Sequence, residues 1–219
     1  MLRIALLCCL LSLNLFAQAD TEAYSRVDFQ VEAAREVAND LLIVNLSVDI
    51  QDKQPAQVAQ QLNTVLNDAL KKSAAFTVVK TSSGNRNTSP VYGKNNQISA
   101  WRGHGQIYLE SRDFRAVSEL IMQLQGALQV AGLQFTIAPD TRLHIENMLI
   151  NEAIAAFQGR AGDIRAAMGA KSYKIVHLSI NAMPFANPMA MSAVRDAAPE
   201  FAGGESRITV QISGTIELQ

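Results

Sequence analysis

An amphipathic segment over residues 140–168 constrains the fold of this chain more than any other stretch, and an apolar strand pattern over residues 173–180 follows it closely. Its apolar side chains recur mostly at intervals of three and four residues, on one helical face: Ile145, Met148, Leu149, Ala153, Ala156, Phe157, Ala161, Ile164 and Met168. Pro139 and Asp140 suit a helix start, and Gly169 suits the left-handed residue that ends one. We therefore expect one long helix near residues 140–169, about 40 Å long and able to cover a whole sheet.

The rest of the chain alternates strand patterns with shorter helices. We interpret the alternating segments at residues 27–33 and 42–50 as an antiparallel hairpin turned by Asn39-Asp40. Helices are predicted from Pro55 to about Ser73 and after the N-cap Asp113. Further strands are predicted over residues 76–80, 98–110, 128–138 (interrupted at Ala131-Gly132) and 207–218. A polar hairpin excursion at the surface is predicted over residues 81–97, and a Pro-, Ala- and Met-bearing loop over residues 183–204.

This order of elements predicts the fold class. Hairpins and helices succeed one another without the regular strand–helix alternation of a parallel sheet, so the class is α+β, with antiparallel sheets and helices packed on one face. We expect two α/β-sandwich-like sub-structures, over about residues 20–92 and 93–219. Gly159 and Gly162 each cost about 1 kcal/mol inside a helix, which indicates a bend or a close approach by another backbone.

The N-terminus is typical of a cleaved secretory signal. Arg3 supplies a positive charge, residues 4–16 are nearly all apolar, and Ala17-Gln18-Ala19 is a small-x-small cleavage site. A stretch of about 13 apolar residues is shorter than the roughly 20 that span a membrane. Residues 1–19 are therefore predicted to be removed, which leaves residues 20–219 as a secreted or periplasmic domain without a membrane span.

Cysteine usage and charge exclude several classes of function. Cys8 and Cys9 both lie in the predicted signal, so the mature protein has no thiol for a disulfide, a nucleophile or a metal. The formal net charge is −1, which provides no basic field to attract nucleic acid.

No catalytic motif is recognisable, and we expect neither an enzyme nor a cofactor. The sequence lacks a His-Glu-x-x-His zinc motif, a Gly-x-Ser-x-Gly elbow and a P-loop. His104 lies between Gly103 and Gly105, which indicate a bulge or a tight backbone approach. The other ionisable candidates are interpreted as solvated surface: His144, the pair Asp49 and Asp52, and the pair Glu146 and Glu152.

One metal hypothesis concerns Met183, Met189 and Met191, with His177 upstream. Thioether ligands favour Cu(I), and a secreted protein without thiols could use methionines to bind copper or absorb oxidant. The alternative, which we favour, is an apolar loop that packs on the body or against a neighbouring subunit.

Several motifs, in this order, resemble one known family. Asn39-Asp40 before LLIVNLSVDIQ resembles its Pro-Asp and strand, and the segment from Pro55 resembles its Ala-rich first helix. A later pattern of Pro-x-Tyr, a turn, Ile-x-x-aromatic and an Asp-led helix is matched by Pro90, Tyr92, Ile98, Trp101 and Asp113. Gly132-Leu133-Gln134-Phe135 and Met168-Gly169 resemble its Gly-led strand and its Leu-Gly helix stop. Asn39 and Trp101 depart from the Pro and Tyr that the family prefers.

The chain is thus similar over most of its mature length to the SIMPL-domain family, long catalogued as a domain of unknown function. The resemblance implies a secreted or periplasmic protein, associated with the outer membrane and with defence against oxidative stress. It also implies self-assembly, because some members resemble building blocks of ring-like oligomers, and it implies no established enzyme reaction. We expect a non-enzymatic, self-assembling envelope protein; the alternative is a small-ligand or copper-binding module that uses the Met-bearing loop.

Overall fold

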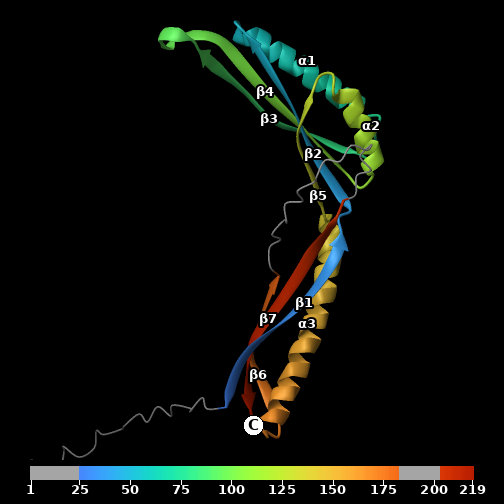
Figure 1. The fold of residues 1–219 in the computed structure, drawn as a ribbon, viewed down its shortest axis with the longest axis vertical. Coiled ribbons are helices and arrows are strands. Elements are labelled where there is room, and N and C mark those ends of the chain that lie inside the picture. The colour runs from blue at the N-terminus through green and yellow to red at the C-terminus, as the bar shows by residue number, and fades with distance from the viewer. Residues whose placement is uncertain (1–24, 183–202) are drawn as a thin grey trace, which may run out of the picture.

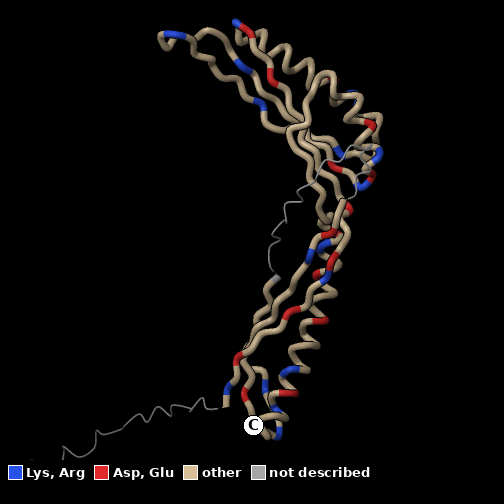
Figure 2. The backbone as a smooth tube through the Cα atoms, in the orientation of Figure 1, with Lys and Arg blue, Asp and Glu red and all other residues tan. Residues whose placement is uncertain are grey.

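The computed structural model describes residues 25–182 and 203–219 and confirms the α+β class. Two antiparallel sheets lie end to end in an elongated body, and each has helices on one of its faces (Figure 1). Charged residues of both signs are interspersed along this body (Figure 2). None of the described helices combines the length and the apolarity that crossing a membrane requires.

The larger sheet has four strands in the order β3-β4-β2-β5, with α1 and α2 packed on one face. Its elements are β2 (Leu41–Asp52), α1 (Pro55–Ser73), β3 (Lys80–Tyr92), η1 (Lys94–Asn96), β4 (Ile98–Ser111), α2 (Phe114–Leu124) and β5 (Gln129–Thr136). Alternate residues of β2 and β4 face the helices and form the core with them; its fully buried members include Leu42, Leu46, Leu66, Ile107, Leu109 and Leu120. The predicted N-cap of α2 is confirmed, since the Asp113 carboxylate accepts a hydrogen bond from the Ala116 N–H at 3.0 Å.

The smaller sheet has three strands in the order β1-β7-β6 and packs on the long helix α3. Its elements are β1 (Arg26–Ala38), α3 (Pro139–Ala167), β6 (Tyr173–Ala182) and β7 (Glu205–Leu218). The expected long helix is confirmed, and Gly169 after its end has the left-handed φ of 69°. Phe157 of α3 stacks on Phe29 of β1, with ring centroids 4.3 Å apart. This half therefore has a core of its own, separate from that of the larger sheet.

The hairpin predicted from residues 27–33 and 42–50 is wrong. β1 pairs with β7 in one sheet, whereas β2 pairs with β4 and β5 in the other. Asn39 and Asp40 carry the chain from one sheet to the other. Their side chains bind residues far along the chain instead of closing a turn: Asn39 binds Gly203 and Ser206, and Asp40 binds Ala138 and Thr141. The sheets also do not follow a boundary near residue 92: the larger one uses residues 41–136, and the smaller one combines β1 with the segments after residue 138.

The structure differs from one local expectation and agrees with the next. Residues 76–79 form turns instead of a strand, with the Val79 N–H donating to the Phe76 carbonyl at 2.9 Å. The polar stretch after residue 80, predicted as a hairpin excursion at the surface, is confirmed as one: it forms β3, which pairs antiparallel with β4 after the turn at η1. Polar residues suit that strand because it lies at the edge of the sheet, where few side chains are buried.

The glycines singled out from the sequence differ in how closely they are packed. A Cβ on Gly105 would lie 2.9 Å from the Cδ1 atoms of both Leu62 and Leu66, so the predicted tight approach is confirmed: α1 packs directly on β4. A Cβ on Gly159 or Gly162 would meet no atom within 4 Å, so the close approach expected at those positions is absent from the described chain. The expected interruption at Ala131 corresponds to a register shift between β2 and β5.

Candidate functional site

The two sheets meet at a junction that Asn39 helps to hold. Its main-chain N–H donates to the Gly204 carbonyl at 3.0 Å, and its side-chain amide donates to the Gly203 carbonyl at 2.7 Å. The Ser206 hydroxyl donates to the Asn39 carbonyl oxygen Oδ1 at 2.6 Å. Asn39 thereby fixes the end of β1 against the start of β7.

Asp40 completes the junction from the other side. Its carboxylate accepts hydrogen bonds from the Ala138 N–H at 2.7 Å and from the Thr141 hydroxyl at 2.6 Å, and both donors lie at the start of α3. Arg112, in the loop between β4 and α2, places its Nε 3.6 Å from the same carboxylate and also pairs with Asp140. We call Asp40, Arg112, Asp140 and Thr141 the junction cluster; it ties the larger sheet to the first turn of α3.

The charges of the junction cluster stabilise one another. Burial raises the pKa of Asp40. The hydrogen bonds from Ala138 and Thr141 and the charge of Arg112 together lower it by more than burial raises it, so the pKa lies below its ordinary value. The hydrogen bond with Arg112 lowers the pKa of Asp140 and raises that of Arg112. Each group is therefore held in its charged form, which suits a structural tie between the two sheets.

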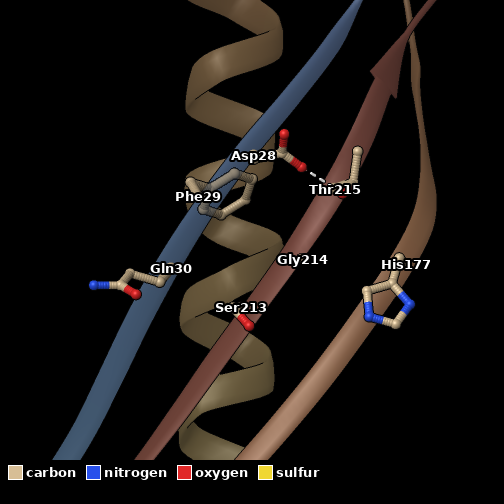
Figure 3. A pocket seen from close by; sticks show the side chains of 7 residues that line it. All are labelled: Asp28, Phe29, Gln30, His177, Ser213, Gly214 and Thr215. Atoms are coloured by element: carbon tan, nitrogen blue, oxygen red, sulfur yellow. Dashed lines mark hydrogen bonds between the residues drawn. The ribbon is translucent and has the colours of Figure 1, made fainter.

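The second candidate is a shallow hollow of about 500 Å³ on the three-stranded sheet. Figure 3 shows its residues on three strands: Asp28, Phe29 and Gln30 on β1, His177 on β6, and Ser213, Gly214 and Thr215 on β7. The Thr215 hydroxyl donates to the Asp28 carboxylate. Because alternate residues of a strand face opposite sides, the polar members lie on the face away from α3, while Phe29 contacts Phe157 of α3. The hollow can offer hydrogen bonds to a small polar molecule.

The methionines of the copper hypothesis lie outside the described residues. Met183, Met189 and Met191 lie among residues 183–202, outside the described residues, so the structure leaves their expected grouping with His177 untested. Within residues 25–182 and 203–219, no three His, Cys, Asp or Glu side chains are placed to hold a metal ion. The neighbours of His177 in the hollow are a carboxylate, hydroxyls and an amide.

The remaining candidates from the sequence are separate surface contacts. His104 Nδ1 lies 3.2 Å from the Asp49 carboxylate across β2 and β4, on the face away from the helices. His144 is exposed on α3. Glu146 pairs with Arg142 of the same helix at 3.6 Å, and Glu152 pairs with Arg35 of β1 at 2.6 Å. The structure brings none of these groups together with His177.

Sequence reasoning missed the junction cluster. Asn39-Asp40 is typical of a tight turn, and Asp140 next to Pro139 is typical of a helix start. Because each pattern is explained by its own neighbours in the sequence, neither indicated a contact with a distant residue. The partner that joins them, Arg112, is 72 residues from Asp40 (112 − 40 = 72). The available signal was the polar dipeptide Asn39-Asp40 between two apolar strands. The same pattern fits a hairpin turn and a connection that passes from one sheet to another, so it does not distinguish them.

Comparison with protein families gives a match over most of the chain. The family model named SIMPL, described as a protein of unknown function (DUF541), matches residues 27–216. A search of curated proteins found no match to the chain. One similar solved structure is described as an unknown protein from Galdieria sulphuraria; it is 10% identical and covers 81% of each chain, with a TM-score of 0.20. A similarity at that score carries no argument about this fold.

Proposed function

Because this chain belongs to the SIMPL family of unknown function, we propose that it is a non-enzymatic, secreted or periplasmic protein that assembles with copies of itself. The localisation rests on the signal-like residues 1–19. The link to oxidative-stress defence and to the outer membrane rests on the family resemblance.

The observation that carries the self-assembly is the open form of the two sheets, whose outer strands pair with one other strand each among the described residues. Each of the two sheets has helices on one face, and each ends in two strands that pair on one side only among the described residues. Unpaired strand edges present rows of N–H and C=O groups to other chains. An elongated body with four such edges suits a building block of a larger assembly.

The non-enzymatic part of the proposal is supported by the use of the charged residues. Active sites concentrate groups with shifted pKa values. In the described residues, the groups with clearly shifted pKa values are Asp40, Arg112 and Asp140, all of the junction cluster. Their hydrogen bonds are taken up by the start of α3 and by one another, so they serve the architecture.

Localisation and assembly can be tested together in cells. The full chain is expressed in a Gram-negative bacterium, and the fraction released by osmotic shock is treated with an amine-reactive cross-linker. We expect a protein that begins after Ala19 by N-terminal sequencing and forms a ladder of cross-linked species. Retention of residues 1–19 in a cytoplasmic protein would contradict the localisation, and a processed protein without cross-linked species would contradict the assembly.

A further inference from the structure

The turned end of the β3–β4 hairpin carries two large apolar side chains on its surface. Tyr92 is 58% exposed and Ile98 is 51% exposed, and the two residues are cross-strand partners, so their side chains lie next to each other. Among the described residues, no other strand pair has two large apolar members that are both exposed. A single exposed apolar side chain needs no explanation, but an adjacent pair on a projecting turn indicates a contact with something outside the chain.

This end of the hairpin projects beyond the rest of its sheet. The pairing of β2 with β4 ends at Asp52 and Trp101, while β3 and β4 continue to pair as far as Tyr92 and Ile98. Figure 1 shows the turn at the end of the elongated body that is far from the C-terminus. We call residues 92–98 the hairpin tip.

The backbone of the hairpin tip forms a defined turn. The Gly93 N–H donates a hydrogen bond to the Gln97 carbonyl at 2.8 Å, which closes the turn. Asn95 and Asn96 have the left-handed φ values of 66° and 58°, a conformation that Asn adopts more readily than most residues. The local sequence therefore fixes the turn that presents the apolar pair.

The charge around the hairpin tip is positive. Residues 69–109, which include all of β3 and most of β4, contain no Asp or Glu, and their basic residues are Lys71, Lys72, Lys80, Arg86, Lys94 and Arg102. Lys94 in the tip and Arg102 behind it are exposed, and neither pairs with a carboxylate in the part of the chain that the structure describes. The hairpin is thus a locally basic element in a chain whose formal net charge is −1.

The acidic residues of the neighbouring strand are set back from the tip. Asp49 and Asp52 of β2 lie opposite His104 and Trp101 of β4, on the body side of the hairpin tip. The Asp49 carboxylate lies 3.2 Å from Nδ1 of His104, and the Asp52 carboxylate accepts a hydrogen bond from the Gln54 N–H at 2.9 Å. Lys94 is therefore the charged residue of the tip itself.

A basic turn with an exposed aromatic and aliphatic pair fits the surface of an anionic membrane. We propose that the hairpin tip binds a bilayer that contains anionic phospholipids, with Ile98 and the ring of Tyr92 between the lipid headgroups and Lys94 at their phosphates. A Tyr side chain suits this boundary because its ring is apolar and its hydroxyl is polar. A Lys close to an anionic lipid surface is attracted to it. The inference rests on the secreted or periplasmic location proposed above, which places the protein beside a membrane, and it names the contact.

The size of the hairpin tip favours a membrane over a protein as its partner. Residues 92–98 form one narrow turn, which is too small to supply the roughly 800 Å² that each partner buries in a standard protein interface. Attachment to a bilayer surface needs only a few apolar and basic side chains, and several copies in an assembly act together. We therefore expect weak binding by one chain and stronger binding by an assembly.

Binding to lipid vesicles tests the proposal. The purified processed protein is mixed with vesicles of phosphatidylcholine alone, or of an equimolar mixture of phosphatidylcholine and phosphatidylglycerol, and the fraction that sediments with the vesicles is measured. We expect binding to the anionic vesicles and much less binding to the neutral ones. Binding to the anionic vesicles should fall in about 1 M salt, which screens the attraction of basic residues to the lipid surface.

Variants locate the contact on the chain. Lys94→Glu should weaken binding to the anionic vesicles at least about tenfold, because it replaces attraction by repulsion. Ile98→Ser should weaken it at least about fivefold, because it removes apolar surface from the contact. The matched controls Lys171→Glu and Met168→Ser change exposed residues just after α3, at the other end of the body, and should leave binding unchanged. Circular dichroism checks that each variant is folded.

Fluorescence quenching supplies a test that does not depend on loss of binding. Trp101 is the single Trp of the chain, so Trp101→Phe gives a background without Trp emission. In that background, Tyr92→Trp places the only Trp at the hairpin tip, and Met168→Trp places it at the other end of the body. Brominated phospholipids in the anionic vesicles should quench the emission of the first variant and leave that of the second unchanged.

The outcomes separate this inference from the proposed function. A processed protein that assembles but does not bind anionic vesicles overturns the membrane contact and leaves the proposed function standing. Lys94→Glu and Ile98→Ser variants that bind vesicles as well as the parent also overturn it. If these two variants lose self-association instead, the hairpin tip is a contact between copies of the chain. An unprocessed cytoplasmic protein contradicts the location on which the inference rests, and with it the proposed function.

Discussion

Gly214 of β7 lies against both β6 and α3. A Cβ at this position would be 2.5 Å from the carbonyl oxygen of His177 and 2.9 Å from Cζ of Phe157. The first distance involves backbone and the second a ring that stacks on Phe29, so neither neighbour can move without disturbing the sheet or the core. The absence of a side chain at residue 214 is therefore a requirement of this packing.

We predict that Gly214→Ala lowers the free energy of unfolding by about 3 kcal/mol, near the upper end of the usual cost of overpacking a core. Urea denaturation of the purified protein measures the change. Gly132→Ala is the matched control, because a Cβ at Gly132 in β5 meets no atom within 4 Å. Equal stability of the two variants would show that the contacts around Gly214 do not restrict side-chain size.

Asp40 makes stability depend on pH. Its pKa in the folded state lies below the ordinary value of 3.8, so its contribution is fully present above the pKa of the unfolded chain and is lost as pH falls through the folded pKa. Asp40→Asn should cost about 1–2 kcal/mol at neutral pH, less than a fully buried charged hydrogen bond because the side chain is 32% exposed.

The measurement is the free energy of unfolding from about pH 7 down to about pH 3. The loss of stability on acidification should be smaller in Asp40→Asn than in the parent protein. Asp68→Asn removes a carboxylate from an exposed pair with Lys71 and serves as the control. A variant that loses as much stability with acid as its parent would exclude Asp40 as a source of the pH dependence.

At the scale of elements, local sequence signals predicted the helices well. α1 begins at Pro55 and ends at Ser73 as expected, and α3 lies between Pro139 and Gly169. These boundaries are set by residues within one turn of the helix end, and such signals survive in any tertiary context.

Strand pairing was harder to predict, because it is decided by distant residues. β1 pairs with β7, for example Arg26 with Glu217, across almost the whole chain. Two alternating segments joined by Asn39-Asp40 have the local pattern of a hairpin whether or not they pair. For the same reason the junction cluster could not be predicted, whereas the tight packing at Gly105 could, since a glycine within a strand indicates close approach on its own.

The outer face of α3 contains two glycines with no packing role in the described chain. A Cβ at Gly159 or Gly162 would project into open space. Gly159→Ala should therefore raise the free energy of unfolding by about 0.5–1 kcal/mol, through the better helix propensity of Ala. Gly162→Ala should behave alike, and thermal unfolding followed by circular dichroism measures both. A loss of stability in either variant would indicate that the glycine is required by a contact or a bend.

At the scale of the whole molecule, two sheets with separate cores are joined by two short connections and the junction cluster. The single Trp of the chain, Trp101, lies in β4 and reports on the larger sheet, while far-UV circular dichroism reports on both halves. In the parent protein we expect the two signals to show coincident unfolding transitions. In Asp40→Asn the midpoints should separate, because the sheets lose part of their coupling. Separate transitions already in the parent protein would contradict the coupling role of the junction cluster.

The most direct test of the central claim, that this elongated chain is a subunit of a larger assembly, is its mass in solution. Size-exclusion chromatography with light scattering, over a dilution series of the purified processed protein, gives that mass. We predict a mass above that of a single chain at high concentration, which falls toward the mass of one chain on dilution. A mass of one chain at every concentration would contradict the self-assembly.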